Sequence, residues 1–237
     1  MSNLFSGLEA FGLGNMKNLE VYGSEEKSGK RPGTEGEEKA KVAESDLIFD
    51  KTYTCPVRDK EFKSKMVKTG KVKLISADTD LRPKYQLVDS LKYDAIVCPH
   101  CGYAALNRFF NYITSAQAKL IKEQISSSFK GIKTEGDILT YDDAIVRHKL
   151  ALLNTIVKKS KLSERAYTCL KTAWMFRGKA EQLMAENPDE KTKEEIKKLQ
   201  KEELEFISNA YEGFVEAFSK EMFPMCGMDE NTMTYLV

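Results

Sequence analysis

Residues 98–102 read Cys-Pro-His-Cys-Gly, which has the form of a zinc-ribbon knuckle. The proline shapes the turn ahead of the second cysteine. The glycine after it lets the backbone turn so that amides point at the thiolates. A structural zinc ion takes four ligands, usually from two such knuckles. This short stretch therefore predicts a second knuckle elsewhere in the chain.

The candidate for that second knuckle starts at Cys55-Pro56, as a knuckle should. Arg58 stands where its second cysteine belongs, and Asp59 stands where its glycine belongs. We interpret this stretch as a knuckle that has lost one of its two ligands.

The ligand set follows from these two stretches. We predict zinc as the cofactor, with Asp59, His100 or water in the fourth position beside three cysteine ligands, Cys55, Cys98 and Cys101. Two alternatives stay open. The Arg58 guanidinium can take the fourth position as a cation beside the thiols, or Cys226 can supply the ligand from the far end of the chain.

A redox interpretation competes with the zinc interpretation. Cys98 and Cys101 have Cys-x-x-Cys spacing between an expected strand and an expected helix, as in thioredoxin-like oxidoreductases. That fold also needs a later proline that leads into a β-hairpin, and neither Pro188 nor Pro224 lies in a strand pattern. An odd number of cysteines also argues against a disulfide framework: Cys55, Cys98, Cys101, Cys169 and Cys226.

Composition divides the chain into four segments and predicts an α+β fold. Residues 1–22 are either a loose tail or a short apolar segment that packs on its own core or on a partner. Residues 23–45 are rich in Gly, Glu and Lys, so we predict a disordered linker. Residues 46–105 form the predicted zinc-ribbon-like β module, and residues 106–237 form the predicted helical domain.

Within the β module, two predicted strands run directly into cysteines, in "LIFDKTYTCP" and "LKYDAIVCP". A turn at Thr69-Gly70 separates two further strand candidates. Val72 and Leu74 alternate with lysines there, which predicts a half-buried strand.

Helical periodicity begins after residue 105. Thr114 and Gln117 have capping-box spacing, and His148 lies on the apolar face of a later helix, as a core histidine would. We predict four helices, which run from Thr114 to about Phe129, over 144–156, from about Ser163, and after an Asn187-Pro188 start. Two of them in succession are similar to a tetratricopeptide-type hairpin, and a plain antiparallel bundle is the alternative.

Charge gives a second functional hypothesis. The chain as a whole is nearly neutral, with 37 basic and 36 acidic residues, so no global field attracts nucleic acid or an anionic membrane. Residues 51–75, however, hold eight basic and two acidic side chains. A nucleic-acid-binding face would use five lysines, Lys63, Lys65, Lys68, Lys71 and Lys73. Only Tyr53 and Phe62 interleave with them for base stacking.

Beyond these patterns, "YTCPVRDKEF", "VCPHCGYAA" and "FPMCGMDENTMTYL" resemble the bacterial family called domain of unknown function 2225. The resemblance covers about residues 46–237 and implies a zinc-ribbon-like module followed by a helical half. Family members carry Cys-Pro-x-Cys-Gly at the first knuckle, so Arg58 and Asp59 are departures. The resemblance implies architecture and no activity.

These observations favour a non-catalytic protein- or peptide-binding scaffold with a structural or degenerate metal site. No Ser-His-Asp set, P-loop or dinucleotide fingerprint is visible, and we predict no catalytic residue. Nucleic-acid binding is the second hypothesis, and thiol-disulfide exchange through Cys98 and Cys101 is the third. The sequence lacks a signal-peptide pattern and a run of about 18 apolar residues, so we expect a cytoplasmic protein without a membrane partner.

Overall fold

The computed structural model describes residues 43–133, 136–186 and 188–235. The chain divides into two units, residues 1–40 and residues 41–237. The predictions for residues 1–22 and for nearly all of 23–45 lie outside the described residues. The predicted β module and helical domain fall in the same unit, and the division between them at residue 105 stays a prediction.

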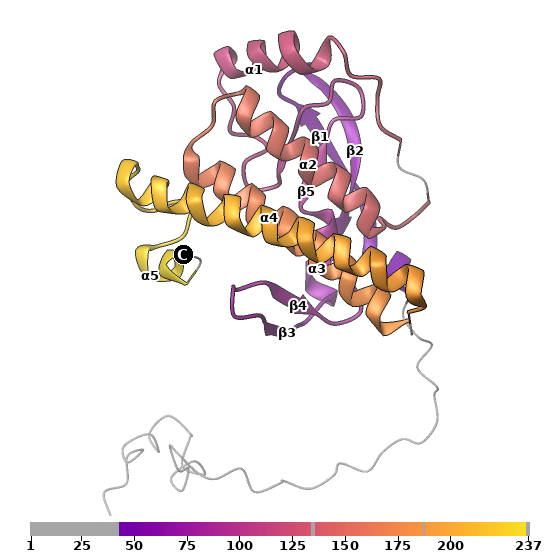
Figure 1. Ribbon diagram of the computed structural model, residues 1–237. Coiled ribbons are helices and arrows are strands. Elements are labelled where there is room, and N and C mark those ends of the chain that lie inside the picture. The colour runs from indigo at the N-terminus through magenta and orange to yellow at the C-terminus, as the bar shows by residue number, and fades with distance from the viewer. Residues whose placement is uncertain (1–42, 134–135, 187, 236–237) are drawn as a thin grey trace, which may run out of the picture. The chain divides into compact units, whose positions relative to one another are not determined.

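The described chain is α+β, as predicted. Strands occupy its first part and helices its second part (Figure 1). Three antiparallel pairs form the sheets: β1 (Ile48–Cys55) with β2 (Lys60–Val67), β3 (Leu74–Ala77) with β4 (Pro83–Tyr85), and β5 (Ala95–Val97) with β6 (Ala104–Leu106). The α-helices are α1 (Ser115–Ile121), α2 (Tyr141–Val157), α3 (Leu162–Ala185), α4 (Glu190–Lys220) and α5 (Glu230–Thr234).

Short polar side chains start α1, α2, α4 and α5, whereas α3 begins after Lys161 without a side-chain cap. Thr114 and Gln117 form the predicted capping box at α1, which continues into a π-turn over Lys122–Ser126. Asp189 starts α4 by accepting a hydrogen bond from the amide of Thr192. The predicted cap, Asn187, lies outside the described residues, and the helix begins two residues beyond Pro188. Aspartate stabilises the start of this helix because its carboxylate accepts a hydrogen bond from an amide that lacks an intrahelical partner.

The helices α2, α3 and α4 pack as consecutive antiparallel neighbours. As residue numbers rise along α3, its partners in α4 fall: Ala166 lies against Gly213, Phe176 stacks on Phe206, and Lys179 pairs with Glu195. Figure 1 shows α4 lying across α3. A Cβ at Gly213 would lie 2.9 Å from the Ala166 Cβ, so the glycine permits the close approach. The tetratricopeptide-like interpretation of these helices stays a prediction.

The prediction that Leu74 lies on a half-buried strand is wrong. Leu74 is 59% exposed and the neighbouring Ile75 is 67% exposed. Charged contacts attach the β3–β4 hairpin to α3, since Arg82 bonds Glu181 at 2.9 Å and Arg177 lies 2.8 Å from Asp80. The alternation of apolar and basic residues predicted a buried strand face wrongly. Polar contacts between distant residues, and not an apolar face, hold this hairpin.

None of the described helices is long and apolar enough to cross a membrane.

His148 is a core histidine, as predicted. It is fully buried in α2, and its Nδ1 lies 2.7 Å from the carbonyl oxygen of Ala144. Burial lowers the pKa of His148 to about 4, although the nearby Asp94 carboxylate opposes part of that shift. The folded protein therefore holds the imidazole neutral across a pH range in which an unfolded chain protonates it.

We predict that this histidine makes stability depend on pH between its unfolded pKa near 6.5 and its folded pKa near 4. The contribution of neutral His148 to the free energy of unfolding is fully present above pH 6.5. It falls by up to roughly 3 kcal/mol as the pH drops to 4. Denaturant unfolding at several pH values, compared with His148→Asn, checks this. The variant keeps a donor for Ala144 and should show a flatter slope in that window. Parallel slopes for the two proteins would contradict the assignment.

Candidate metal centre

Three cysteine sulfurs meet where the first and third hairpins face each other. Cys55 is the last residue of β1, and Cys98 and Cys101 lie in the loop between β5 and β6. Their sulfurs all lie within 4.8 Å of one another, and the Cys55–Cys101 separation is 3.6 Å. Zinc–sulfur bonds of about 2.3 Å in a tetrahedron place sulfurs about 3.8 Å apart. The three cysteines therefore fit a thiophilic metal ion.

The two loops that carry these cysteines have equivalent backbones. The amide of Gly102 donates to the carbonyl of Cys98 at 3.1 Å, and the amide of Asp59 donates to the carbonyl of Cys55 at 2.7 Å. Gly102 has φ of 72° and Asp59 has φ of 57°, so both occupy the left-handed region. Aspartate tolerates this conformation better than most residues. The degenerate knuckle has therefore kept the knuckle turn.

The equivalence extends to the amides around the sulfurs. The amides of Val57 and Arg58 hydrogen-bond to the Cys55 thiol, and those of His100 and Cys101 hydrogen-bond to the Cys98 thiol. Each first cysteine thus receives bonds from the residues two and three positions later. Such bonds stabilise a thiolate, which is the form that binds metal.

Proton sharing among the three thiols separates their pKa values. Hydrogen bonds from Cys101 and Cys55 hold the pKa of Cys98 well below its usual range. Hydrogen bonds with Cys55 and Cys98, together with burial, raise the pKa of Cys101. Buried like charges cannot all form without a compensating cation, so a metal ion would displace the remaining protons.

The fourth position of the site is the position of Arg58. In the equivalent backbone, Arg58 takes the place that Cys101 takes in the intact knuckle. Among the described residues, the group that can hold a metal comprises Cys55, Cys98 and Cys101. The two predicted fourth ligands, Asp59 and His100, have exposed side chains and lie outside that group.

Cys226 and Cys169 also lie outside the group. Cys226 is half-buried in the turn before α5, and Ser163, the second residue of α3, hydrogen-bonds to its thiol. Cys169 is buried in the helical core beside Ala166 and Leu170. Neither side chain joins the three clustered cysteines.

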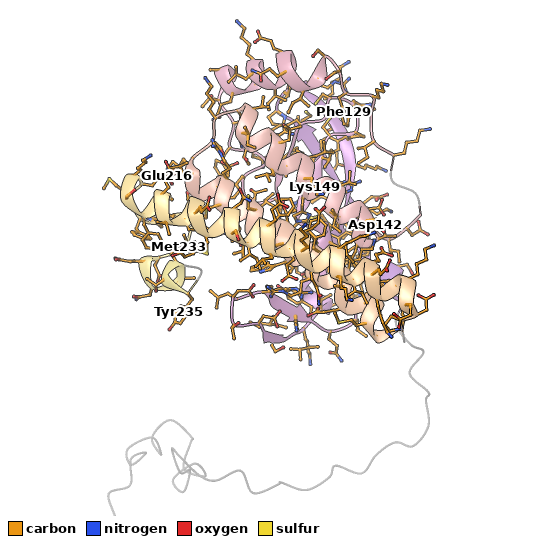
Figure 2. The ribbon with its side chains drawn as sticks, in the orientation of Figure 1. Phe129, Asp142, Lys149, Glu216, Met233 and Tyr235 are labelled. Carbon is orange, nitrogen blue, oxygen red and sulfur yellow. The ribbon has the colours of Figure 1, made fainter. Side chains whose placement is uncertain are left out.

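Polar contacts from distant elements fix the intact knuckle. The Asn154 amide, on α2, donates to the Gly102 carbonyl at 2.9 Å, and the Ser126 hydroxyl donates to the Cys101 carbonyl at 2.9 Å. Phe129, labelled in Figure 2, packs so closely that a Cβ at Gly102 would lie 2.8 Å from its ring. The sequence does not identify these three residues as neighbours of the knuckle, because nothing local to them indicates a partner 25 or more positions away.

An aromatic cluster lies beside the same site. Tyr53 and Phe62 stack at 6.0 Å between ring centroids, and both contact Phe110. Tyr103 packs on Phe110 and donates its hydroxyl proton to the Phe110 carbonyl at 2.8 Å. These rings join the three cysteines in one buried cluster, so the metal-site residues belong to the core of this part of the chain.

The predicted basic face is only partly available. Lys65 lies 3.7 Å from Asp50, and Lys68 donates to the Asp46 carbonyl at 2.9 Å. The remaining three lysines have exposed side chains, Lys63, Lys71 and Lys73. Burial of Tyr53 and Phe62 in the aromatic cluster leaves neither ring open to a nucleic-acid base.

Taken together, these features define an α+β protein with a buried three-cysteine site that is compatible with a zinc-ribbon-like module. Residues 48–237 match the model of a family described as "Uncharacterized protein conserved in bacteria (DUF2225)". The chain belongs to this bacterial family, which confirms the resemblance seen in its cysteine motifs. Comparison with curated proteins and with solved structures finds no significant match.

We predict that Arg58→Cys completes a four-thiolate site and raises zinc affinity by at least roughly tenfold, because the backbone there already follows a knuckle turn. Competition with a chromophoric chelator measures the affinity. Arg58→Ala is the matched control, since it removes the guanidinium without adding a sulfur. Equal gains in both variants would mean that the arginine's charge, and not a missing ligand, weakens binding.

Proposed function

We propose that this protein is a non-catalytic protein- or peptide-binding scaffold whose three-cysteine site holds a structural zinc ion. The observation that carries the metal part is the pair of equivalent knuckle turns, which bring three buried thiols together from positions 55, 98 and 101. The left-handed Asp59 and the amides that hydrogen-bond to Cys55 reproduce the backbone of the intact knuckle at Cys98–Gly102.

Burial supports a structural ion over a catalytic one. Cys55, Cys98 and Cys101 are 0%, 1% and 3% exposed. Catalytic zinc keeps a position open to water and substrate, with a base nearby. In the described part of the chain, no His, Asp or Glu joins the three sulfurs. The cysteines would hold the ion, and the ion would tie the β1–β2 hairpin to the β5–β6 hairpin.

Burial also disfavours thiol-disulfide exchange. An attacking thiolate must reach a sulfur of its partner, so redox cysteines are partly exposed. Cys98 and Cys101 are both almost fully buried, and Cys55 lies close to both of them. The shared surroundings of these three thiols support metal binding.

The scaffold part of the proposal is supported by a groove on the helices. A cavity of about 320 Å³ opens between α2, α3 and α4, and its lining includes Leu152, Ile156 and Phe206. Ile156 is 51% exposed although it belongs to an apolar stripe. A groove with exposed apolar walls between helices is a common docking site for a peptide.

We predict one zinc ion per purified chain, and a midpoint of thermal unfolding several degrees lower after chelation, because metal-binding energy adds directly to folding energy. Elemental analysis and unfolding curves with and without chelator measure both. Cys98→Ser should lose the metal, whereas Cys226→Ser, a cysteine outside the group, should keep it. A zinc content near zero in the wild-type chain would remove the structural-ion proposal.

Nucleic-acid binding remains the second candidate because Lys63, Lys71 and Lys73 are exposed. We expect weak binding at most, since the neighbouring aromatic rings are buried and two of the five lysines already have acceptors. A gel-shift titration with single-stranded RNA and DNA at several salt concentrations checks this. A tight, salt-sensitive shift that disappears in Lys63→Glu/Lys71→Glu/Lys73→Glu would favour this candidate over the scaffold.

A further inference from the structure

The groove on the helices has an apolar side that nothing in the described chain covers. Ile156 lines the groove, and Leu153 and Val146 lie on the same face of α2 at helical spacing. These three side chains are 51%, 46% and 48% exposed. Exposed apolar side chains that continue a groove mark an interaction surface more often than isolated ones do.

The opposite wall of the groove is acidic. Glu205, Glu212 and Glu216 line it from α4, at spacings of seven and four residues that place them along one side of the helix. Glu216 pairs with Lys220, but in the described part of the chain no ion pair joins Glu205 or Glu212. Against these three carboxylates the lining holds one guanidinium, that of Arg165. The groove therefore favours a positively charged occupant.

Arg165 also lies in the lining. Its Nη2 donates to the Ser160 carbonyl at 3.4 Å, while its Nε is buried without a hydrogen-bond partner among the described residues. A buried donor without an acceptor is costly.

The groove has a defined length. Phe206 lies near one end, where the Lys149 ammonium is 5.7 Å from its ring centre and pairs with Glu202 at 3.2 Å. Glu216 lies toward the other end, and Figure 2 labels both Lys149 and Glu216. Glu205 to Glu216 spans roughly 16 Å of helix at about 1.5 Å per residue. That length matches about three turns of a docked helix.

We propose that the groove between α2 and α4 binds a basic amphipathic helix of about three turns, with its apolar face toward Ile156 and Leu152 and its Lys or Arg side chains along the acidic wall of α4. This inference rests on the proposed scaffold function and names the partner's chemistry. A second copy of this chain that docks groove to groove is disfavoured as the occupant, because it would bring a second acidic wall toward the first.

The test uses the full chain with its metal and two fluorescein-labelled 14-residue probes. One probe places leucines on one helical face and lysines elsewhere, and the other replaces every lysine with glutamate. Fluorescence anisotropy measures binding to the wild type and to Glu205→Lys/Glu212→Lys. The matched control is Glu61→Lys/Glu194→Lys, because these exposed glutamates carry the same charges outside the groove. Ile156→Ser tests the apolar wall without touching a buried residue.

The basic probe should bind the wild type, and the groove variant should lose roughly tenfold in affinity at low salt, with the loss shrinking as salt rises. The control should change less than twofold, and Ile156→Ser should weaken binding at every salt concentration. Equal binding of the acidic probe, or an equal loss in the control, overturns the basic partner but leaves a peptide-binding scaffold standing.

Two other outcomes also overturn the inference. Self-association of the wild type that the groove variants abolish would assign the groove to a second copy of this chain. If neither probe binds the wild type, and the groove variants alter neither probe binding nor self-association, the groove is not a docking site. The proposed scaffold function is then also contradicted. Zinc content, measured on the same samples, separates that failure from a failure of the metal site.

Discussion

The contact between the two knuckle turns is the interaction on which the β1–β2 and β5–β6 hairpins depend. Each sheet among the described residues has only two strands, and an isolated two-stranded hairpin is marginally stable in water. The β1–β2 and β5–β6 hairpins meet at Cys55, Cys98 and Cys101, and the aromatic rings beside these thiols form the rest of the shared core. Three adjacent buried thiols attract one another only weakly. A metal ion bound between them would supply the attraction that joins the two hairpins.

The β3–β4 hairpin is held by a different interaction. Arg82 is 3% exposed and contacts carboxylates from both sides, at 2.9 Å to Glu181 and 3.7 Å to Asp89. Arg177 joins Asp80 on the hairpin to Glu203 on α4. Buried charges of this kind tolerate the loss of a partner poorly, because the remaining charge stays desolvated. The hairpin therefore has a fixed place on α3 although its apolar side chains are exposed.

Local chemistry was predictable from the sequence, and long-range contacts were not. The Thr114 capping box, the buried His148 and the convergence of three cysteines follow from short patterns with a physical cause. The prediction of a half-buried strand at Leu74 fails because alternating apolar residues indicate a buried strand face only where a core lies beneath that face. The contacts of Asn154 and Ser126 with the knuckle carbonyls required the fold, since a single Asn or Ser in a helix has no partner signal of its own.

Helix α2 connects the candidate metal centre to the groove. Asn154 projects toward the intact knuckle and bonds the carbonyl of Gly102, while Ile156, two residues later, lines the groove on a different side of the helix. Residues two apart in a helix point about 200° apart around its axis, so one turn of α2 contacts both sites. Loss of order at the knuckle removes a buried hydrogen bond from α2 and loosens the groove wall that the same turn supplies. A metal ion held by the three cysteines would therefore stabilise the helical surface as well as the hairpins.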